Sequence, residues 1–168
     1  SDLLDLTALR EHRLNVNPEL CYLQPIVCSA VDLINVQFSA KNIRIENQVS
    51  EFVLPVHGDP SRIGQVLLNL IYNACKFTSE GPVQIRSATD DENLRTEIHD
   101  SGPGVKDSDH QLIFEAFEQE SPTMTEGLGL GLSISKEIIE EHGGQIGVEP
   151  FPLGGACFWF SLPLAQPA

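Results

Sequence analysis

Residues 60–76 carry the strongest helix pattern in the chain, and Asp59-Pro60 stand directly before it. An aspartate at that position accepts hydrogen bonds from the free backbone N–H groups of the first turn, and proline suits the first helical position. Apolar residues at helical spacing then form one face, which we expect to pack in the core. This face consists of Ile63, Val66, Leu67, Leu70, Ile71 and Ala74.

The other face of the same helix is polar. Its residues recur at helical spacing and are Gln65, Asn69, Tyr72, Asn73 and Lys76. Two asparagines one turn apart gain nothing from helix propensity, because asparagine is a mediocre helix former. An amide oxygen is a hard, neutral ligand that suits Mg²⁺, and a lysine one turn further on can contact a phosphate. The stripe therefore indicates either a metal–phosphate site or a solvated helix face.

Further helix and strand patterns surround this segment. Helical spacing predicts helices over residues 24–39, 109–117 and 132–141. Alternation predicts strands over residues 42–46, 52–56, 83–88, 94–98, 145–148 and 156–162. Helices interspersed with hairpins predict an α+β fold, in which three main helices stack on one face of a mixed sheet.

Two glycine-rich segments are candidates for ligand contact. DSGPG at residues 100–104 follows an apolar strand, and a carboxylate fixed beside such a turn can accept a hydrogen bond from an exocyclic amine. GLGLG at residues 127–131 precedes a predicted helix, whose free N–H groups attract anions. Its spacing matches neither a Rossmann fingerprint nor a Walker loop. Taken singly, an acidic turn and a flexible hinge remain alternatives for the two segments.

Charge and cysteine usage exclude several classes of protein. The net charge of −14, from 10 Lys+Arg against 24 Asp+Glu, disfavours nucleic acid and anionic membrane surfaces as partners. No apolar run is long enough for a transmembrane helix. The four cysteines form no CxxC pair, which favours reduced thiols and a cytoplasmic location. Because Ser1 opens the chain and Met124 is its only methionine, we expect a fragment of a longer protein.

The motifs are more specific in combination. GDPSRIGQVLLNLIYNACKF, DSGPGV, LIFEAFEQ, GLGLGLSISKEIIEEHGG and GACFWFSLPL follow one another in this order. Together they resemble the catalytic ATP-binding domain of sensor histidine kinases, within the GHKL superfamily, over about residues 19–164. The resemblance implies a Bergerat fold, a two-layer α/β sandwich that holds nucleotide between helices and a lid. Residues 1–18 resemble the end of a second dimerisation helix with its linker, and residues 165–168 form a tail.

The resemblance also implies residue roles. Asn73 would bind Mg²⁺, Lys76 would contact phosphate and Asn69 would line the phosphate side, which makes these three the catalytic candidates. Phe77 would pack near the adenine, and Asp100 would accept a hydrogen bond from its amino group. Other nucleotide contacts would come from Gly102, Gly104, Phe117, Gly127, Gly129, Leu130, Gly131 and Leu132, with Phe114 anchoring the lid beside Phe117.

The implied reaction is transfer of the ATP γ-phosphate to a histidine on a dimerisation helix. Implied partners are ATP, Mg²⁺, the phosphoacceptor helix of the same parent protein, and a response regulator or receiver domain. We expect a homodimeric parent and a monomeric fragment. None of the five histidines sits in an H-E-x-x-T-P context, so we expect this chain to bind ATP without phosphorylating itself.

Three alternatives stay open. A degenerate nucleotide-binding module is favoured by the segment 119–126, which lacks the Lys or Arg that kinase lids often carry. A GHKL-type ATPase is disfavoured because Asn69 stands where such enzymes place a glutamate, and an amide cannot act as a general base. An interaction domain without ligand would show no nucleotide-induced change in melting temperature.

Overall fold

The structure, a computed structural model, describes residues 15–104, 128–150 and 154–165. Its helices are α2 (Leu23–Gln37), α3 (Pro60–Phe77) and α4 (Leu128–Glu141). Its strands are β1 (Glu19–Cys21), β2 (Asn42–Asn47), β3 (Val56–Gly58), β4 (Glu80–Thr89), β5 (Asn93–His99), β6 (Gln145–Pro150) and β7 (Ala156–Pro163). Predictions for residues 1–14 and for a helix over 109–117 lie outside the described residues.

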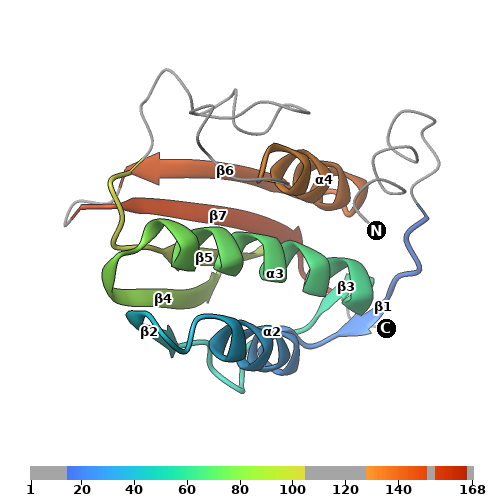
Figure 1. Ribbon diagram of the computed structural model, residues 1–168. Helices are drawn as coiled ribbons and strands as arrows, with labels where there is room; N and C mark the ends of the chain where they lie inside the picture. The colour runs from blue at the N-terminus through green and yellow to red at the C-terminus, as the bar shows by residue number, and fades with distance from the viewer. Residues whose placement is uncertain (1–14, 105–127, 151–153, 166–168) are drawn as a thin grey trace.

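Five strands form one mixed sheet in the order β2-β4-β5-β7-β6. β2 runs parallel to β4, and the other neighbouring pairs are antiparallel. The three helices lie side by side on one face of this sheet, with α3 between α2 and α4 (Figure 1). The predicted two-layer α+β arrangement is therefore confirmed. A separate two-stranded sheet joins β1 to β3.

Helix α3 is the centre of the core, as its pattern predicts. All six residues of the predicted apolar face are fully buried. The Asp59 side chain accepts hydrogen bonds from the backbone N–H groups of Ser61 and Arg62, and Pro60 opens the helix, so the predicted N-terminus is confirmed. None of the three described helices combines the length and apolar character that crossing a bilayer requires.

Two boundary predictions are wrong. The strand expected at 52–56 begins only at Val56, and Phe52 and Leu54 before it are 84% and 52% exposed. Helix α4 begins at Leu128 rather than at 132. Three glycines lie in or next to this extra turn, and each glycine costs about 1 kcal/mol in a helix interior. Packing of Ile134 and Ile138 in the core outweighs that local preference.

Side chains of β5 alternate between the two faces of the sheet. Leu94, Thr96 and Ile98 are buried on the face that the helices cover. Arg95, Glu97 and His99 therefore belong to the opposite face, which we call the outer face.

Candidate functional site

The two asparagines of α3 are both at least partly buried, and Asn69 contacts α4. The Asn69 amide donates a hydrogen bond to the Ser135 hydroxyl of α4 at 3.2 Å, and Asn73, one turn later, is only 5% exposed. Tyr72 instead packs edge-to-face on Phe38, with ring centroids 5.3 Å apart. Phe38 follows α2, on the other side of α3. Within the predicted stripe, Tyr72 therefore lies toward the end of α2, whereas Asn69 contacts α4.

Lys41, which the sequence patterns did not indicate, caps the C-terminal end of α3. The last carbonyl groups of a helix lack partners within it. The Lys41 ammonium group donates to the backbone oxygens of Cys75 and Lys76 at 3.0 and 3.1 Å. Lys76 extends over the ring of Phe77, with its nitrogen 5.9 Å from the centroid. Two cationic side chains therefore stand at this end of an otherwise acidic domain.

Asp100 lies directly after β5 and is 5% exposed. Its Oδ1 accepts hydrogen bonds from the backbone N–H groups of Gly102 at 3.0 Å and Ala156 at 2.9 Å. Burial raises the pKa of this carboxyl group, although both hydrogen bonds and nearby His99 oppose that shift. Within the part of the chain that the structure describes, Oδ2 has no hydrogen-bond partner, so it is the atom that can accept from a ligand.

The turn before β7 fits closely around this aspartate. Gly155 has a φ of +82°, and a Cβ there would lie 2.3 Å from the Asp100 backbone oxygen and 2.7 Å from its Oδ1. Only glycine allows both the conformation and the approach. The sequence reasoning missed this residue, although the pair Gly154-Gly155 directly before the last apolar strand was a usable signal.

The glycines of the loop 100–104 pack mainly against protein backbone. A Cβ on Gly102 would lie 2.6 Å from the backbone oxygen of Phe77. The Ser101 N–H donates to the Thr78 hydroxyl at 3.0 Å, which also ties this loop to the end of α3. Gly104 has a φ of +83°. The loop therefore holds Asp100 beside the C-terminal end of α3.

The glycine-rich segment is described only in part. Phe114, Phe117 and Gly127 lie outside the described residues. Gly129, Leu130 and Gly131 belong to the first turns of α4, where the first backbone N–H groups have no acceptor within the helix. Leu132 is 3% exposed and belongs to the core. The anion site expected at this helix start stays a prediction, and the helix itself begins earlier in the chain.

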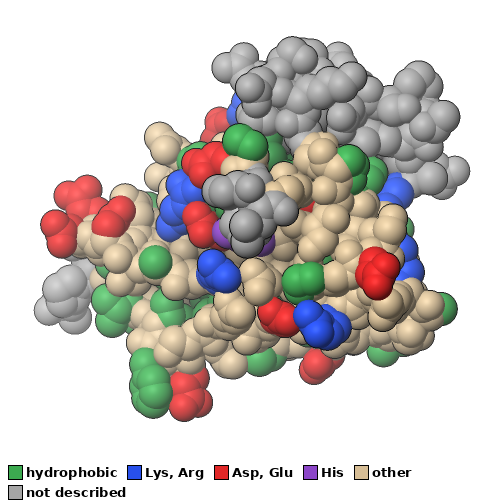
Figure 2. All heavy atoms as spheres, turned by 90° about the vertical axis from the view of Figure 1, so that its left-hand side faces the viewer, with side chains coloured by type: hydrophobic (Ala, Val, Ile, Leu, Met, Phe, Trp, Pro, Cys, Tyr) green, Lys and Arg blue, Asp and Glu red, His purple; other side chains and the backbone are tan. Residues whose placement is uncertain are grey.

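The C-terminal end of α3 and the loop 100–104 lie at one end of the molecule (Figure 1). Figure 2 shows this end, where basic side chains are interspersed with acidic ones rather than excluded. A groove of ≈ 530 Å³ lies elsewhere, between α2 and α3, and its lining includes Ile26, Leu33 and Leu68 but none of the predicted site residues. The candidate site consequently comprises the end of α3, the loop 100–104, the turn at 154–156 and α4.

Comparison with known proteins identifies the family of the chain. The model of the family "Histidine kinase-, DNA gyrase B-, and HSP90-like ATPase" matches residues 58–166. The sensor protein GacS of Pseudomonas syringae pv. syringae is 34% identical over 175 residues, which cover 99% of this chain and 19% of GacS. The chain thus spans about a fifth of that relative's length.

Solved structures give the same result. Full-length ShkA in complex with AMPPNP superposes with a TM-score of 0.87 at 32% identity, covering 99% of this chain and 35% of ShkA. The catalytic domain of histidine kinase ThkA gives a TM-score of 0.77 at 31% identity, covering 89% of this chain and 99% of that domain. The chain therefore belongs to the family of histidine kinase-, DNA gyrase B- and HSP90-like ATPases and, within it, to the ATP-binding catalytic domains of sensor histidine kinases.

Proposed function

We propose that this chain binds Mg-ATP at the C-terminal end of α3 and transfers the γ-phosphate to a histidine on a separate helix. The main support is the arrangement of Asp100, a buried carboxylate with one oxygen held by two backbone N–H groups. The second oxygen is left to accept a hydrogen bond from an adenine amino group. A fixed acceptor of this kind selects for a donor at one position, which favours adenine over guanine.

Asn73 is the candidate Mg²⁺ ligand. Its amide oxygen is a hard donor, and its 5% exposure places it where a ligand group would be shielded from solvent. Bound Mg²⁺ would neutralise negative charge on the phosphates. Lys76 would contact a phosphate, and the Asn69 amide, already oriented by Ser135, would line the phosphate side. Gly129, Leu130 and Gly131 would offer backbone N–H groups to the phosphates from the start of α4.

The chemistry required of these residues is modest. In phosphoryl transfer the protein mainly positions the reactants and stabilises charge. The attacking nitrogen would come from a histidine of a dimerisation helix in the parent protein, which we expect to be a homodimer. A response regulator or receiver domain would then accept the phosphoryl group. With these partners and ATP, we expect the domain to act in the cytoplasm.

Calorimetric titration of Mg-ATP into the wild type and Asp100→Asn tests the nucleotide site. Replacing the free acceptor oxygen by an NH₂ donor opposes the adenine amino group, so we expect affinity to fall at least about tenfold, or about 1.4 kcal/mol. Asp91→Asn, an exposed acid in the β4–β5 turn, is the matched control and should bind like the wild type. Equal affinity for wild type and Asp100→Asn would contradict the proposed recognition of adenine.

Transfer is tested separately, by adding a helical hairpin that carries an acceptor histidine. Phosphohistidine on the hairpin supports the kinase, and its formation should be lost in Asn73→Ala. Mg-ATP binding without phosphohistidine would favour the degenerate nucleotide-binding module. Appreciable hydrolysis of ATP without any hairpin would favour the ATPase instead.

A further inference from the structure

We propose that Glu97, His99 and Cys157 form a binding site for a divalent cation of the zinc class on the outer face of the sheet. The three residues supply one carboxylate oxygen, one imidazole nitrogen and one thiol sulfur. Borderline-soft cations such as Zn²⁺ favour this mixture of donors, whereas Mg²⁺ prefers oxygen ligands alone. The site is therefore distinct in chemistry from the proposed Mg-ATP site.

The sheet register brings these donors together. His99 lies directly opposite Cys157 in the antiparallel pair of β5 and β7. Glu97 precedes His99 by two residues and therefore shares its face of the sheet. Ligand atoms of all three residues lie within 4.8 Å of one another. Three donors from two adjacent strands thus converge without any change of the backbone.

The separations are close to those of a tetrahedral zinc site. Bonds of about 2.0–2.3 Å at tetrahedral angles place neighbouring ligand atoms about 3.3–3.6 Å apart. Nε2 of His99 and Oε1 of Glu97 are already 3.1 Å apart. The thiol of Cys157 has to approach by at most about 1.5 Å, which rotation of its side chain provides. Water would complete a four-coordinate site.

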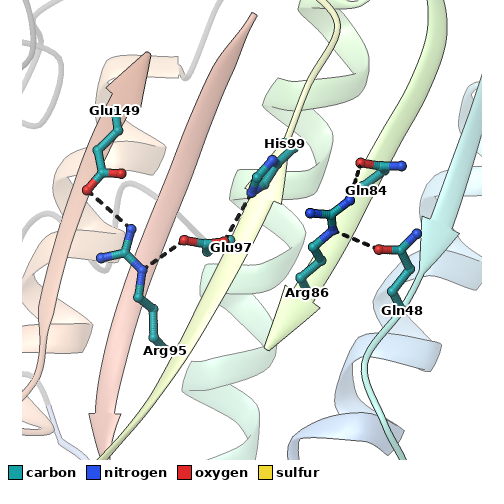
Figure 3. A network of polar contacts seen from close by, with 7 residues as sticks. All are labelled: Gln48, Gln84, Arg86, Arg95, Glu97, His99 and Glu149. Carbon is teal, nitrogen blue, oxygen red and sulfur yellow. Dashed lines mark hydrogen bonds and ion pairs between the residues drawn. The ribbon is translucent and has the colours of Figure 1, made fainter. Parts of the chain in front are cut away.

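Neighbouring charges orient the carboxylate and favour a cation. Figure 3 shows Arg95 between Glu97 and Glu149, and His99 on the other side of Glu97. Arg95 bonds Oε2 of Glu97 at 2.9 Å, which directs Oε1 toward His99. Glu149 pairs in register with Cys157 from the third strand, β6. With Asp100, three carboxylates and one guanidinium group therefore act on the thiol and leave net negative charge.

Burial distinguishes this cluster from an ordinary surface ion-pair network. His99 and Cys157 are 7% and 4% exposed, although both belong to the outer face. Burial, reinforced by the neighbouring carboxylates Glu97 and Glu149, raises the pKa of the Cys157 thiol to about 12. A bound cation removes this penalty, because a coordinated thiol loses its proton. Cation binding should therefore release a proton from Cys157.

The site is adjacent to the nucleotide site in the chain. His99 immediately precedes Asp100, and Cys157 immediately follows Ala156, whose N–H binds the Asp100 carboxylate. A cation bound by His99 and Cys157 would cross-link β5 and β7 one residue from that carboxylate. Binding of the cation itself does not depend on the proposed function, so its test omits nucleotide.

Titration of Co²⁺ into the reduced 168-residue chain tests the site, because tetrahedral Co²⁺ absorbs in the visible region and its thiolate bond adds a charge-transfer band. We expect both signals to saturate at one Co²⁺ per chain and Zn²⁺ to displace them. Cys157→Ser should abolish the charge-transfer band, and His99→Gln should weaken binding at least about tenfold. Cys28→Ser and His57→Gln, which alter residues outside the cluster, should retain both signals.

Glu97→Gln is the variant to use if Cys157→Ser or His99→Gln fails to fold, because the Glu97 side chain is 30% exposed. It should weaken Co²⁺ binding while leaving the circular dichroism spectrum unchanged. A charge-transfer band that persists in Cys157→Ser would overturn the proposal, as would the absence of any saturable tetrahedral signal in the wild type. Equal Co²⁺ affinity in Glu97→Gln and wild type would overturn the carboxylate's part in the site.

Discussion

The two ends of α3 use buried polar groups in opposite ways. At the N-terminal end, Oδ1 of Asp59 accepts from Ser61 and Arg62, and Oδ2 accepts from the backbone N–H of Asn17. The Asp59 N–H itself donates to the imidazole of His142 at 3.0 Å. The chain thus satisfies both carboxylate oxygens of this aspartate internally, which is what a structural role requires.

At the C-terminal end, the protein bonds only one of the two carboxylate oxygens of Asp100. Oδ1 of Asp100 is held by backbone N–H groups, and Oδ2 has no partner among the residues described. Lys76 contacts the Phe77 ring. The difference teaches that a buried polar residue with one group fixed and another available indicates a ligand. A residue whose polar groups are all bonded within the protein, such as Asp59, has a structural role.

The largest effect is expected from Gly155→Ala, which changes a residue in contact with Asp100 near the C-terminal end of α3. An alanine there adopts an unfavourable positive φ and also collides with Asp100, so we expect a loss of about 2–4 kcal/mol in the free energy of unfolding. Mg-ATP binding should be lost with it. Urea denaturation and calorimetry measure the two effects.

Gly154→Ala is the matched control for that change. Gly154 also has a positive φ, of 101°, but a Cβ there meets nothing within 4 Å. It should cost only the backbone term, about 1–2 kcal/mol, and leave nucleotide affinity within twofold. Equal losses of affinity in both variants would show that contact with Asp100 is not the reason for glycine at 155.

Asp59→Ala removes the cap at the N-terminal end of α3 and should affect stability alone. Losing a helix cap that also binds a distant N–H should lower the free energy of unfolding by about 2 kcal/mol. Mg-ATP affinity of the folded protein should stay within about twofold, since the proposed site lies at the other end of α3. Asp32→Ala, an exposed acid on α2, should change neither quantity. A tenfold loss of affinity in Asp59→Ala would erase the distinction between the two ends.

Lys41→Met should have a smaller effect at the C-terminal end. Its ammonium group is bonded to two terminal carbonyl oxygens of α3, and a cation there also opposes the negative end of the helix dipole. We expect a loss of about 1 kcal/mol, measured by thermal denaturation. Arg44→Met, a 73%-exposed cation on β2, is the control and should be nearly neutral. Equal losses would argue that overall charge, not the cap, is responsible.

Strong periodic patterns predicted most of the fold. The apolar face of α3, its cap at Asp59 and the β4–β5 hairpin depend on local spacing, and all were predicted. Strand β1 was missed because three residues carry no readable period, and its strand character depends on pairing with β3. The strand expected at 52–56 shows the reverse failure, since only Val56 pairs with another strand, and Phe52 and Leu54 face solvent.

The candidate site was predictable in its residues but less so in their geometry. Asn69, Asn73 and Asp100 follow from motif and helix spacing. That Tyr72 turns to α2 depends on Phe38, which no spacing within α3 reveals. The contacts of Gly155 and Lys41 are likewise tertiary, joining residues more than 30 positions apart. The Glu97–His99–Cys157 cluster depends on register between strands, which a single sequence does not supply.

The pH dependence of nucleotide binding gives the finest comparison of the two ends. Because the pKa of Asp100 is raised in the folded chain, protonation favours the fold, and that stability is lost as pH rises through the raised pKa. Burial therefore destabilises the ionised form of Asp100 when no ligand is bound. A hydrogen bond from an adenine amino group would stabilise that form. Mg-ATP affinity should fall a few-fold on acidification, at a pH above the ordinary aspartate value of 3.8. Calorimetry at a series of pH values should show this step in wild type and Asp59→Ala but not in Asp100→Asn. Because ATP titrates identically in all three, a step of equal size in Asp100→Asn would assign the pH dependence to the nucleotide and remove Asp100 from its recognition.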